Sequence, residues 1–117
     1  GQASPFGFGT DAQPWLPQPA AWADLTAEKQ ASDPGSTLSL YRAALALRRA
    51  RPEFRTGELS WLDLGADVVA FQRGDALAVV VNFGSAPVSL PAGEVLLTSA
   101  PLVEGLLPLD ATTWIAL

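Results

Sequence analysis

The run of residues 76–83 constrains the fold of this chain more than any other feature. Every side chain in the run is apolar except that of Asn82. A strand with one face in water alternates apolar and polar residues, whereas an unbroken apolar run of this length is typical of a strand covered on both faces. We therefore expect residues 76–83 to form the central strand of a sheet.

The turn before this run predicts how the central strand pairs with the strand that precedes it. Residues 74–75 are Gly-Asp, and a two-residue loop with glycine first is typical of a type II′ hairpin. Such a loop places Phe71 opposite Ala78. It also places Ala70 opposite Val79, so large and small side chains face each other across the hairpin.

Further turn residues divide the second half of the chain into short β-type segments. Strands are predicted at residues 59–64, 68–73, 76–83, 88–90, 94–98 and 112–117. The predicted fold class is mainly β: an antiparallel β-sandwich-like domain, preceded by an N-terminal loop and one long helix.

The first 35 residues predict a long loop. Prolines interrupt any periodic element at Pro5, Pro14, Pro17, Pro19 and Pro34. Residues 25–30 predict a short helical turn near the end of this loop. The loop also carries large apolar side chains that need a surface to lie on, and long loops of this kind are often functional.

A long helix is predicted over residues 36–50, with Asp33 as its N-cap and Pro34 in its first turn. Pro52 ends it. Its apolar arc is broader than a one-sided surface helix needs, so we expect cover on two sides. Arg48 falls inside that arc, and burial without a partner would cost several kcal/mol, so we expect a carboxylate or backbone carbonyl at its head group.

Charge and composition exclude several classes of function. Twelve acidic and seven basic residues give a net charge of −5, which argues against a nucleic-acid partner. Four arginines lie together at Arg48, Arg49, Arg51 and Arg55, at the end of the predicted helix, where cations complement the helix dipole. The sequence has no cysteine and no histidine, which excludes Cys-type zinc sites and Ser-His or Cys-His mechanisms within this chain.

No membrane partner is expected, because the sequence lacks an apolar run of about 18 residues. Residues 1–5 also lack the features of a signal peptide. A cytoplasmic protein is the default expectation. A start at Gly1 rather than Met leads us to expect an incomplete product.

Carboxylates and aromatic side chains are the candidate functional groups. Glycoside hydrolysis needs two carboxyl groups about 5–10 Å apart, but the acidic residues of the second half follow turns or strand ends, where a capping or solvated role is expected. In the first loop, Asp11 can contact sugar hydroxyls, and Phe8 and Trp15 can stack on a pyranose ring. The alternative is that these aromatic residues anchor the loop on a neighbouring surface. We predict no catalytic residue, metal site or cofactor in this chain.

Several segments, taken in order, resemble a known family. They are Gly7-Phe8-Gly9, Pro14-Trp15-Leu16-Pro17, Gln30, Asp33-Pro34-Gly35-Ser36 and residues 40–49, followed by residues 69–73, 78–83 and 113–117. Their order and spacing resemble the C-terminal part of bacterial α-glucosidases and oligo-1,6-glucosidases of the α-amylase superfamily, glycoside hydrolase family 13. The resemblance covers nearly the whole chain.

This resemblance implies an assignment for each half of the chain. Residues 1–56 are expected to be the end of a catalytic (β/α)8 barrel of the TIM type, namely the loop after strand 8 and helix 8. Residues 57–117 are expected to be the C-terminal antiparallel β-domain. The family implies a retaining mechanism whose Asp nucleophile, Glu acid/base and histidines lie on earlier strands, so no catalytic residue is carried over to this chain.

The chain is thus expected to be a fragment that is not catalytic alone. Its expected partner is the remainder of the barrel, and an α-glucoside is the expected substrate of the parent enzyme. Two alternatives stay open. The chain could be a stand-alone β-module that binds carbohydrate or is structural, or its parent could be a trehalose synthase or another transglycosylase.

Overall fold

The computed structural model describes residues 5–9 and 14–117. Contacts between residues divide the chain into two units, Gly1–Ala44 and Leu45–Leu117.

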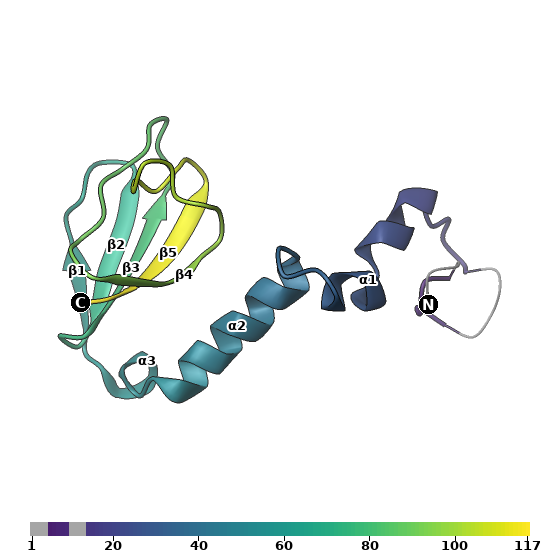
Figure 1. The fold of residues 1–117 in the computed structure, drawn as a ribbon, viewed down its shortest axis with the longest axis horizontal. Helices are drawn as coiled ribbons and strands as arrows, with labels where there is room; N and C mark the ends of the chain where they lie inside the picture. Colours follow the sequence, from purple (N-terminus) through teal and green to yellow (C-terminus); the bar gives the residue numbers. More distant parts are fainter. Residues whose placement is uncertain (1–4, 10–13) are drawn as a thin grey trace. The chain divides into compact units, whose positions relative to one another are not determined.

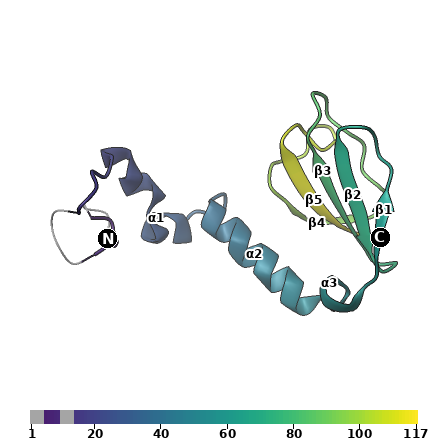
Figure 2. The ribbon, with the colours of Figure 1, turned by 180° about the vertical axis from the view of Figure 1, so that it is seen from behind.

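A five-stranded antiparallel sheet is the main element of the second unit (Figure 1). Its strands are β1 (Leu59–Leu62), β2 (Val68–Arg73), β3 (Leu77–Asn82), β4 (Glu94–Thr98) and β5 (Ala111–Ala116). They lie in the order β1-β2-β3-β5-β4, and Figure 2 shows the same sheet from behind. The predicted mainly β, antiparallel fold is confirmed.

β3 is the central strand, as its apolar sequence predicted. The side chains of Leu77, Ala78, Val79 and Val80 are all buried, which confirms that both faces of this strand are covered. The strand predicted at residues 88–90 is not formed, and Val88 makes an isolated bridge to Leu107 instead. Prolines flank this segment on both sides and remove the N–H groups that a longer ladder would need.

The pairing of β2 with β3 differs from the prediction by one residue. Phe71 lies opposite Val79 rather than Ala78. Ala70 lies opposite Val80 rather than Val79. Because a shift of one residue moves a side chain to the other face of the sheet, Phe71 shares the face of Val79.

The shift arises because the hairpin loop contains three residues, 74–76, instead of two. The outer two of these residues bond to neighbouring segments. The N–H of Gly74 donates to the carbonyl oxygen of Glu58 at 2.8 Å, and the carbonyl of Ala76 accepts from the N–H of Leu117 at 3.1 Å. These bonds come from segments distant in sequence, so the local turn pattern could not predict them.

The core of the second unit lies on one face of the sheet, which we call the inner face. Its buried side chains are Ala70, Ala78, Val80, Leu107, Ala111 and Ile115. The segments that join β3 to β4 and β4 to β5 cover this face, and they contribute the partly buried side chains of Val88, Leu90, Ala100 and Leu102. The second layer of the domain is therefore built of connecting segments.

The long helix α2 (Thr37–Ala50) begins within one residue of its predicted start and ends as predicted. Its cap is different. The Ser36 hydroxyl accepts a hydrogen bond from the N–H of Ser39 at 3.2 Å, whereas the Asp33 carboxylate accepts from the N–H of Gly35 at 2.8 Å. A helix that starts at residue 37 needs its cap at residue 36, and Asp33 belongs to the turn before it.

The predictions about the cover of α2 and the partner of Arg48 were wrong for the described chain. No residue of α2 is buried. Arg48 is exposed and makes no hydrogen bond or ion pair with the described residues. Tyr41 and Leu45, on the same arc, are 64% and 48% exposed. The guanidinium of Arg48 therefore keeps its hydration, and it needs no partner.

The described residues also form three short helices, and only one of them was predicted. They are η1 (Ala20–Leu25), a 3-10 helix, α1 (Ala27–Ala31) and α3 (Glu53–Thr56). The predicted turn at residues 25–30 corresponds to α1. No helix in the described ranges combines the length and apolarity that a bilayer span requires.

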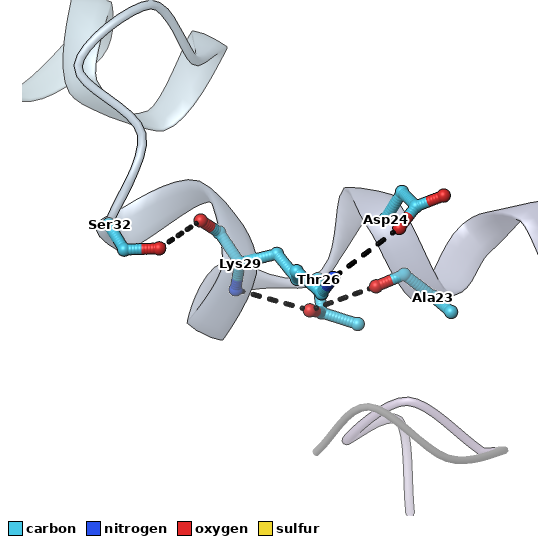
Figure 3. A network of polar contacts seen from close by, with 5 residues as sticks. All are labelled: Ala23, Asp24, Thr26, Lys29 and Ser32. Carbon is cyan, nitrogen blue, oxygen red and sulfur yellow. Dashed lines mark hydrogen bonds and ion pairs between the residues drawn. The ribbon is translucent and has the colours of Figure 1, made fainter.

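A network of polar contacts joins η1 to α1 in the first unit (Figure 3). The Thr26 hydroxyl donates to the carbonyl oxygen of Ala23 and accepts from the N–H of Lys29, both at 3.3 Å. The Lys29 ammonium lies 3.6 Å from a carboxylate oxygen of Asp24, and the Ser32 hydroxyl donates to the carbonyl oxygen of Lys29 at 2.9 Å. Thr26 is the N-cap of α1 and is itself buried.

Gln30 connects α1 to the start of α2. Its side-chain nitrogen donates to the carbonyl oxygen of Leu25 at 2.6 Å. Its side-chain oxygen accepts from the N–H of Leu38 at 3.0 Å. One side chain thus fixes the turn between two helices, which accounts for this glutamine at this position.

Candidate functional site

The first unit contains a hollow of about 570 Å³ whose lining includes three aromatic side chains, Phe8, Trp15 and Trp22. We call it the aromatic hollow. The other described lining residues are Pro5, Gly9, Pro14, Leu16, Pro17 and Gln18. Its volume is typical of small-molecule sites, which hold about 300–1,000 Å³.

The aromatic rings in this hollow are open to solvent. Phe8 and Trp15 are 85% and 95% exposed. A solvent-exposed ring of this size leaves apolar surface in contact with water, which favours a ligand with an apolar face. The C–H surface of a pyranose ring is such a face.

Gln18 adds a polar group to the lining. It lies between Pro17 and Pro19, and the residue before a proline is restricted to extended backbone. Its side-chain oxygen is buried and has no hydrogen-bond partner among the described residues. A buried acceptor without a donor costs about 1–3 kcal/mol, so a hydroxyl donor from a ligand would be favourable here.

The described lining of the aromatic hollow is suited to binding a neutral ligand. None of its described lining residues carries a charge, so these residues supply no acid/base pair of carboxyl groups. In the ranges 5–9 and 14–117, no three His, Cys, Asp or Glu side chains gather closely enough to hold a metal ion. Stacking and one acceptor for a hydroxyl group suit a neutral sugar unit.

The structure brings together two of the three residues predicted for a substrate loop. Phe8 and Trp15 line the same hollow, and Asp11 lies outside the described residues. Gln18 was not predicted as part of the site. The signal that could have found it is its position between two prolines in an aromatic loop.

The second unit has a smaller hollow of about 260 Å³ on the face of the sheet opposite the core, which we call the outer face. It is lined by Arg48, Phe54, Phe71, Arg73, Val79 and Trp114. The rings of Phe54 and Trp114 have centroids 4.6 Å apart. The Nε and Nη2 atoms of Arg73 donate to the carbonyl oxygens of Glu53 and Phe54, at 3.5 and 3.2 Å, and hold α3 beside β2.

The family of the chain follows from its second half. A family model described as a domain of unknown function, DUF3459, matches residues 54–114, more than half of the chain. The chain belongs to the DUF3459 family. DUF3459 is the C-terminal domain of the α-amylase family, so the resemblance to the C-terminal part of an α-glucosidase-like enzyme is confirmed. The matched part of this DUF3459 chain extends from α3 into β5.

Individual relatives of this DUF3459 chain are much longer enzymes. A protein of Rhizobium meliloti (strain 1021) named "Probable alpha-glucosidase" is 32% identical over 72 residues, which are 62% of this chain and 13% of the relative. Isomaltulose synthase from Klebsiella sp. LX3 aligns with a TM-score of 0.72 and 24% identity, over 89% of this chain and 22% of its own. An α-glucosyl transfer enzyme aligns with a TM-score of 0.64 and 27% identity, over 89% of this chain and 22% of its own. The chain therefore spans less than a quarter of the length of these relatives.

Proposed function

We propose that the chain is the C-terminal part of a retaining α-glucosidase that hydrolyses α-linked glucosides or oligosaccharides. Its role is to support the catalytic barrel, and it is not catalytic alone. The 32% identity to the Rhizobium protein named as an α-glucosidase is the observation that carries this proposal. In this proposal, residues 1–56 are the end of the barrel and residues 57–117 the C-terminal domain.

The aromatic hollow is the part of this chain that contacts the sugar in our proposal. Phe8 and Trp15 stack on a glucosyl ring, and the side-chain oxygen of Gln18 accepts from a sugar hydroxyl. Asp11, in the same loop, contributes a second acceptor. The absence of charge among the described lining residues and the exposed rings support this role.

The experiment compares the 117-residue chain with the parent protein from the same reading frame. The parent should hydrolyse a chromogenic α-glucoside, and proton NMR should show that the released sugar keeps its α-configuration, because a retaining mechanism inverts the anomeric centre twice. The 117-residue chain should show no turnover. An inactive or inverting parent, or turnover by the purified chain, would contradict the proposal.

A transglycosylase is the second candidate for the parent, because the α-glucosyl transfer enzyme aligns with 89% of this chain. The two activities differ in the acceptor. Product analysis of the parent with a disaccharide substrate separates them, since free glucose is expected from hydrolysis and a new oligosaccharide or isomer from transfer.

A stand-alone carbohydrate-binding module is the third candidate, favoured by the aromatic hollow. It predicts that the 117-residue chain binds maltose or a longer glucan without any other part of an enzyme. Isothermal titration calorimetry measures this directly, and a heat of binding that disappears in Trp15→Ala would favour the module.

A further inference from the structure

A tight turn at residues 5–8 leads into the first aromatic ring of the hollow. The N–H of Phe8 donates to the carbonyl oxygen of Pro5 at 2.9 Å. The two central residues both have positive φ, 53° at Phe6 and 89° at Gly7, which is the backbone signature of a type I′ turn. The turn therefore bonds Pro5 to Phe8, and both of these residues line the aromatic hollow.

The residues at the centre of this turn differ in how well they suit it. An aromatic residue rarely adopts positive φ, because its Cβ atom then lies close to a carbonyl oxygen. Phe6 nevertheless has this conformation, and such backbone is found mainly at ligand sites and switch regions. Gly7 adopts positive φ without a steric penalty. Gly7 is therefore the residue that makes the turn accessible.

The position of the Phe8 ring depends on the backbone before it. The ring is 85% exposed, so contacts with the described residues hold little of its surface in place. Gly7 itself does not line the hollow, and a Cβ atom added to it would meet nothing within 4 Å among the described residues. Gly7 thus acts on the hollow through the conformation of the chain.

A turn in the second unit has nearly the same geometry and a different setting. Glu104 and Gly105 have φ values of 51° and 80°, and the N–H of Leu106 donates to the carbonyl oxygen of Val103 at 2.9 Å. This turn closes a β-bridge between Val103 and Leu106. A Cβ atom at Gly105 would also meet nothing within 4 Å among the described residues. The two glycines therefore differ in what their turns place, rather than in strain or space.

We infer that Gly7 is a positioning residue for sugar binding: its positive φ holds the Phe8 ring at the aromatic hollow. The inference rests on the proposed function, and it adds a residue that contacts no ligand. It also assigns the unusual conformation of Phe6 a purpose, since the turn needs positive φ at both central positions.

The test compares Gly7→Ala with Gly105→Ala in the parent enzyme. Both variants introduce the same methyl group at a position of positive φ, so both carry the same kind of backbone penalty. Gly105 lies in the second unit and does not line the hollow, which makes it the matched control. Gly7→Asn is the conservative variant, because asparagine tolerates the left-handed conformation.

We expect Gly7→Ala to raise KM for an α-glucoside about threefold with a smaller effect on kcat, since a displaced ring loses part of its stacking. Gly7→Asn should restore the wild-type KM. Gly105→Ala should lower the midpoint of thermal unfolding and leave KM unchanged. A purely structural role for Gly7 would lower the unfolding midpoint in the same way without moving KM.

A double-mutant cycle shows whether Gly7 acts through Phe8. Phe8→Ala should raise KM about fivefold. Adding Gly7→Ala to it should change KM no further, because the ring that Gly7 positions is already absent. Independent, multiplying effects of the two substitutions would overturn the inference. So would an unchanged KM in either single variant, or a Gly7→Asn variant as impaired as Gly7→Ala.

Isothermal titration calorimetry with maltose separates this inference from the proposed activity, because it needs no turnover. A parent that turns over no α-glucoside, but binds maltose more weakly in Gly7→Ala than in Gly105→Ala, would overturn the proposed activity alone. Wild-type turnover with equal KM values in these two variants would overturn the inference alone. A parent that neither hydrolyses an α-glucoside nor binds maltose would overturn both.

Discussion

The side-chain nitrogen of Asn82 donates a hydrogen bond to the carbonyl oxygen of Leu107 at 3.2 Å, across 25 positions of sequence. The same nitrogen lies 2.9 Å from the carbonyl oxygen of Ala86 and 3.1 Å from that of Pro108. The side-chain oxygen of Asn82 accepts from the N–H of Gly84 at 2.9 Å. One buried side chain therefore fastens both covering segments to β3, and the second layer of the domain depends on it.

Asn82→Ala should destabilise the second unit by about 3 kcal/mol. The substitution removes the donor for three carbonyl groups, of which that of Leu107 keeps a hydrogen bond from the N–H of Val88. A buried polar group left without a partner costs about 1–3 kcal/mol. Urea unfolding of the 117-residue chain, followed by tryptophan fluorescence, measures the loss. Ser60→Ala on the exposed part of β1 is the matched control and should change the free energy of unfolding by less than about 0.5 kcal/mol.

Asn82→Asp separates the hydrogen bonds from the shape of the side chain. Aspartate has nearly the same volume, but its ionised carboxylate cannot donate. It should therefore be at least as destabilising as Asn82→Ala. Unfolding of the Asp variant at the wild-type urea midpoint would contradict the role of Asn82 as a donor.

Gly57→Ala should destabilise the chain by about 2 kcal/mol. A Cβ atom at this position would lie 2.6 Å from the carbonyl oxygen of Glu53 and 2.8 Å from backbone atoms of Arg73 and Gly74. Because these neighbours are backbone, they cannot move aside as a flexible side chain would, and overpacking of this kind costs about 1–3 kcal/mol. Differential scanning calorimetry reports the change in unfolding temperature.

Gly9→Ala is the control for this substitution. A Cβ atom at Gly9 would meet nothing within 4 Å among the described residues. It should leave the unfolding temperature unchanged within error. If Gly57→Ala were equally neutral, α3 would have to approach β2 less closely than the structure shows.

Amide hydrogen exchange should be slow in β3 and fast in the N-terminal part of the chain. Amides of β3 should exchange about a thousandfold more slowly than amides of residues 1–31, because exchange from a buried central strand requires opening of the sheet. Residues of η1 and α1 are not buried, so local opening exposes them. Mass spectrometry of peptic peptides after deuterium labelling provides the rates, and uniform protection across both segments would show that the first unit is as stable as the sheet.

The limits of a strand were predicted best where turn residues mark both of its ends. The observed β2 and β4 have the predicted limits, since turn residues stand at their ends. The hairpin register was missed because the bond from Leu117 to Ala76 joins the loop to the residue that follows β5. The exposure of Arg48 was missed for a related reason. The periodicity of α2 shows which residues share a side, but not whether another element covers that side.

The candidate site was predictable only in part for the same physical reason. Phe8 and Trp15 could be named because aromatic side chains in a proline-rich loop need a surface or a ligand. Gln18 was not named: its position between two prolines is a signal, but the burial of its side-chain oxygen depends on how the loop folds around it. Residue type indicates what a side chain can bind, whereas burial decides whether it lacks a partner.

Trp15→Ala in the parent enzyme should raise KM for an α-glucoside about five- to tenfold, with a smaller effect on kcat. Stacking by an aromatic ring contributes about 0.5–1.5 kcal/mol, and Trp15 is 95% exposed at the aromatic hollow, so its removal should cost binding without disturbing packing. Trp15→Phe should keep most of the affinity because it keeps a ring face. Leu25→Ala is the control, since Leu25 is also exposed, at 64%, but does not line the hollow. Steady-state kinetics of the four proteins decide the role of the loop. A KM unchanged in Trp15→Ala, combined with a lower unfolding temperature, would show that Trp15 anchors the loop on the rest of the enzyme instead of contacting the sugar.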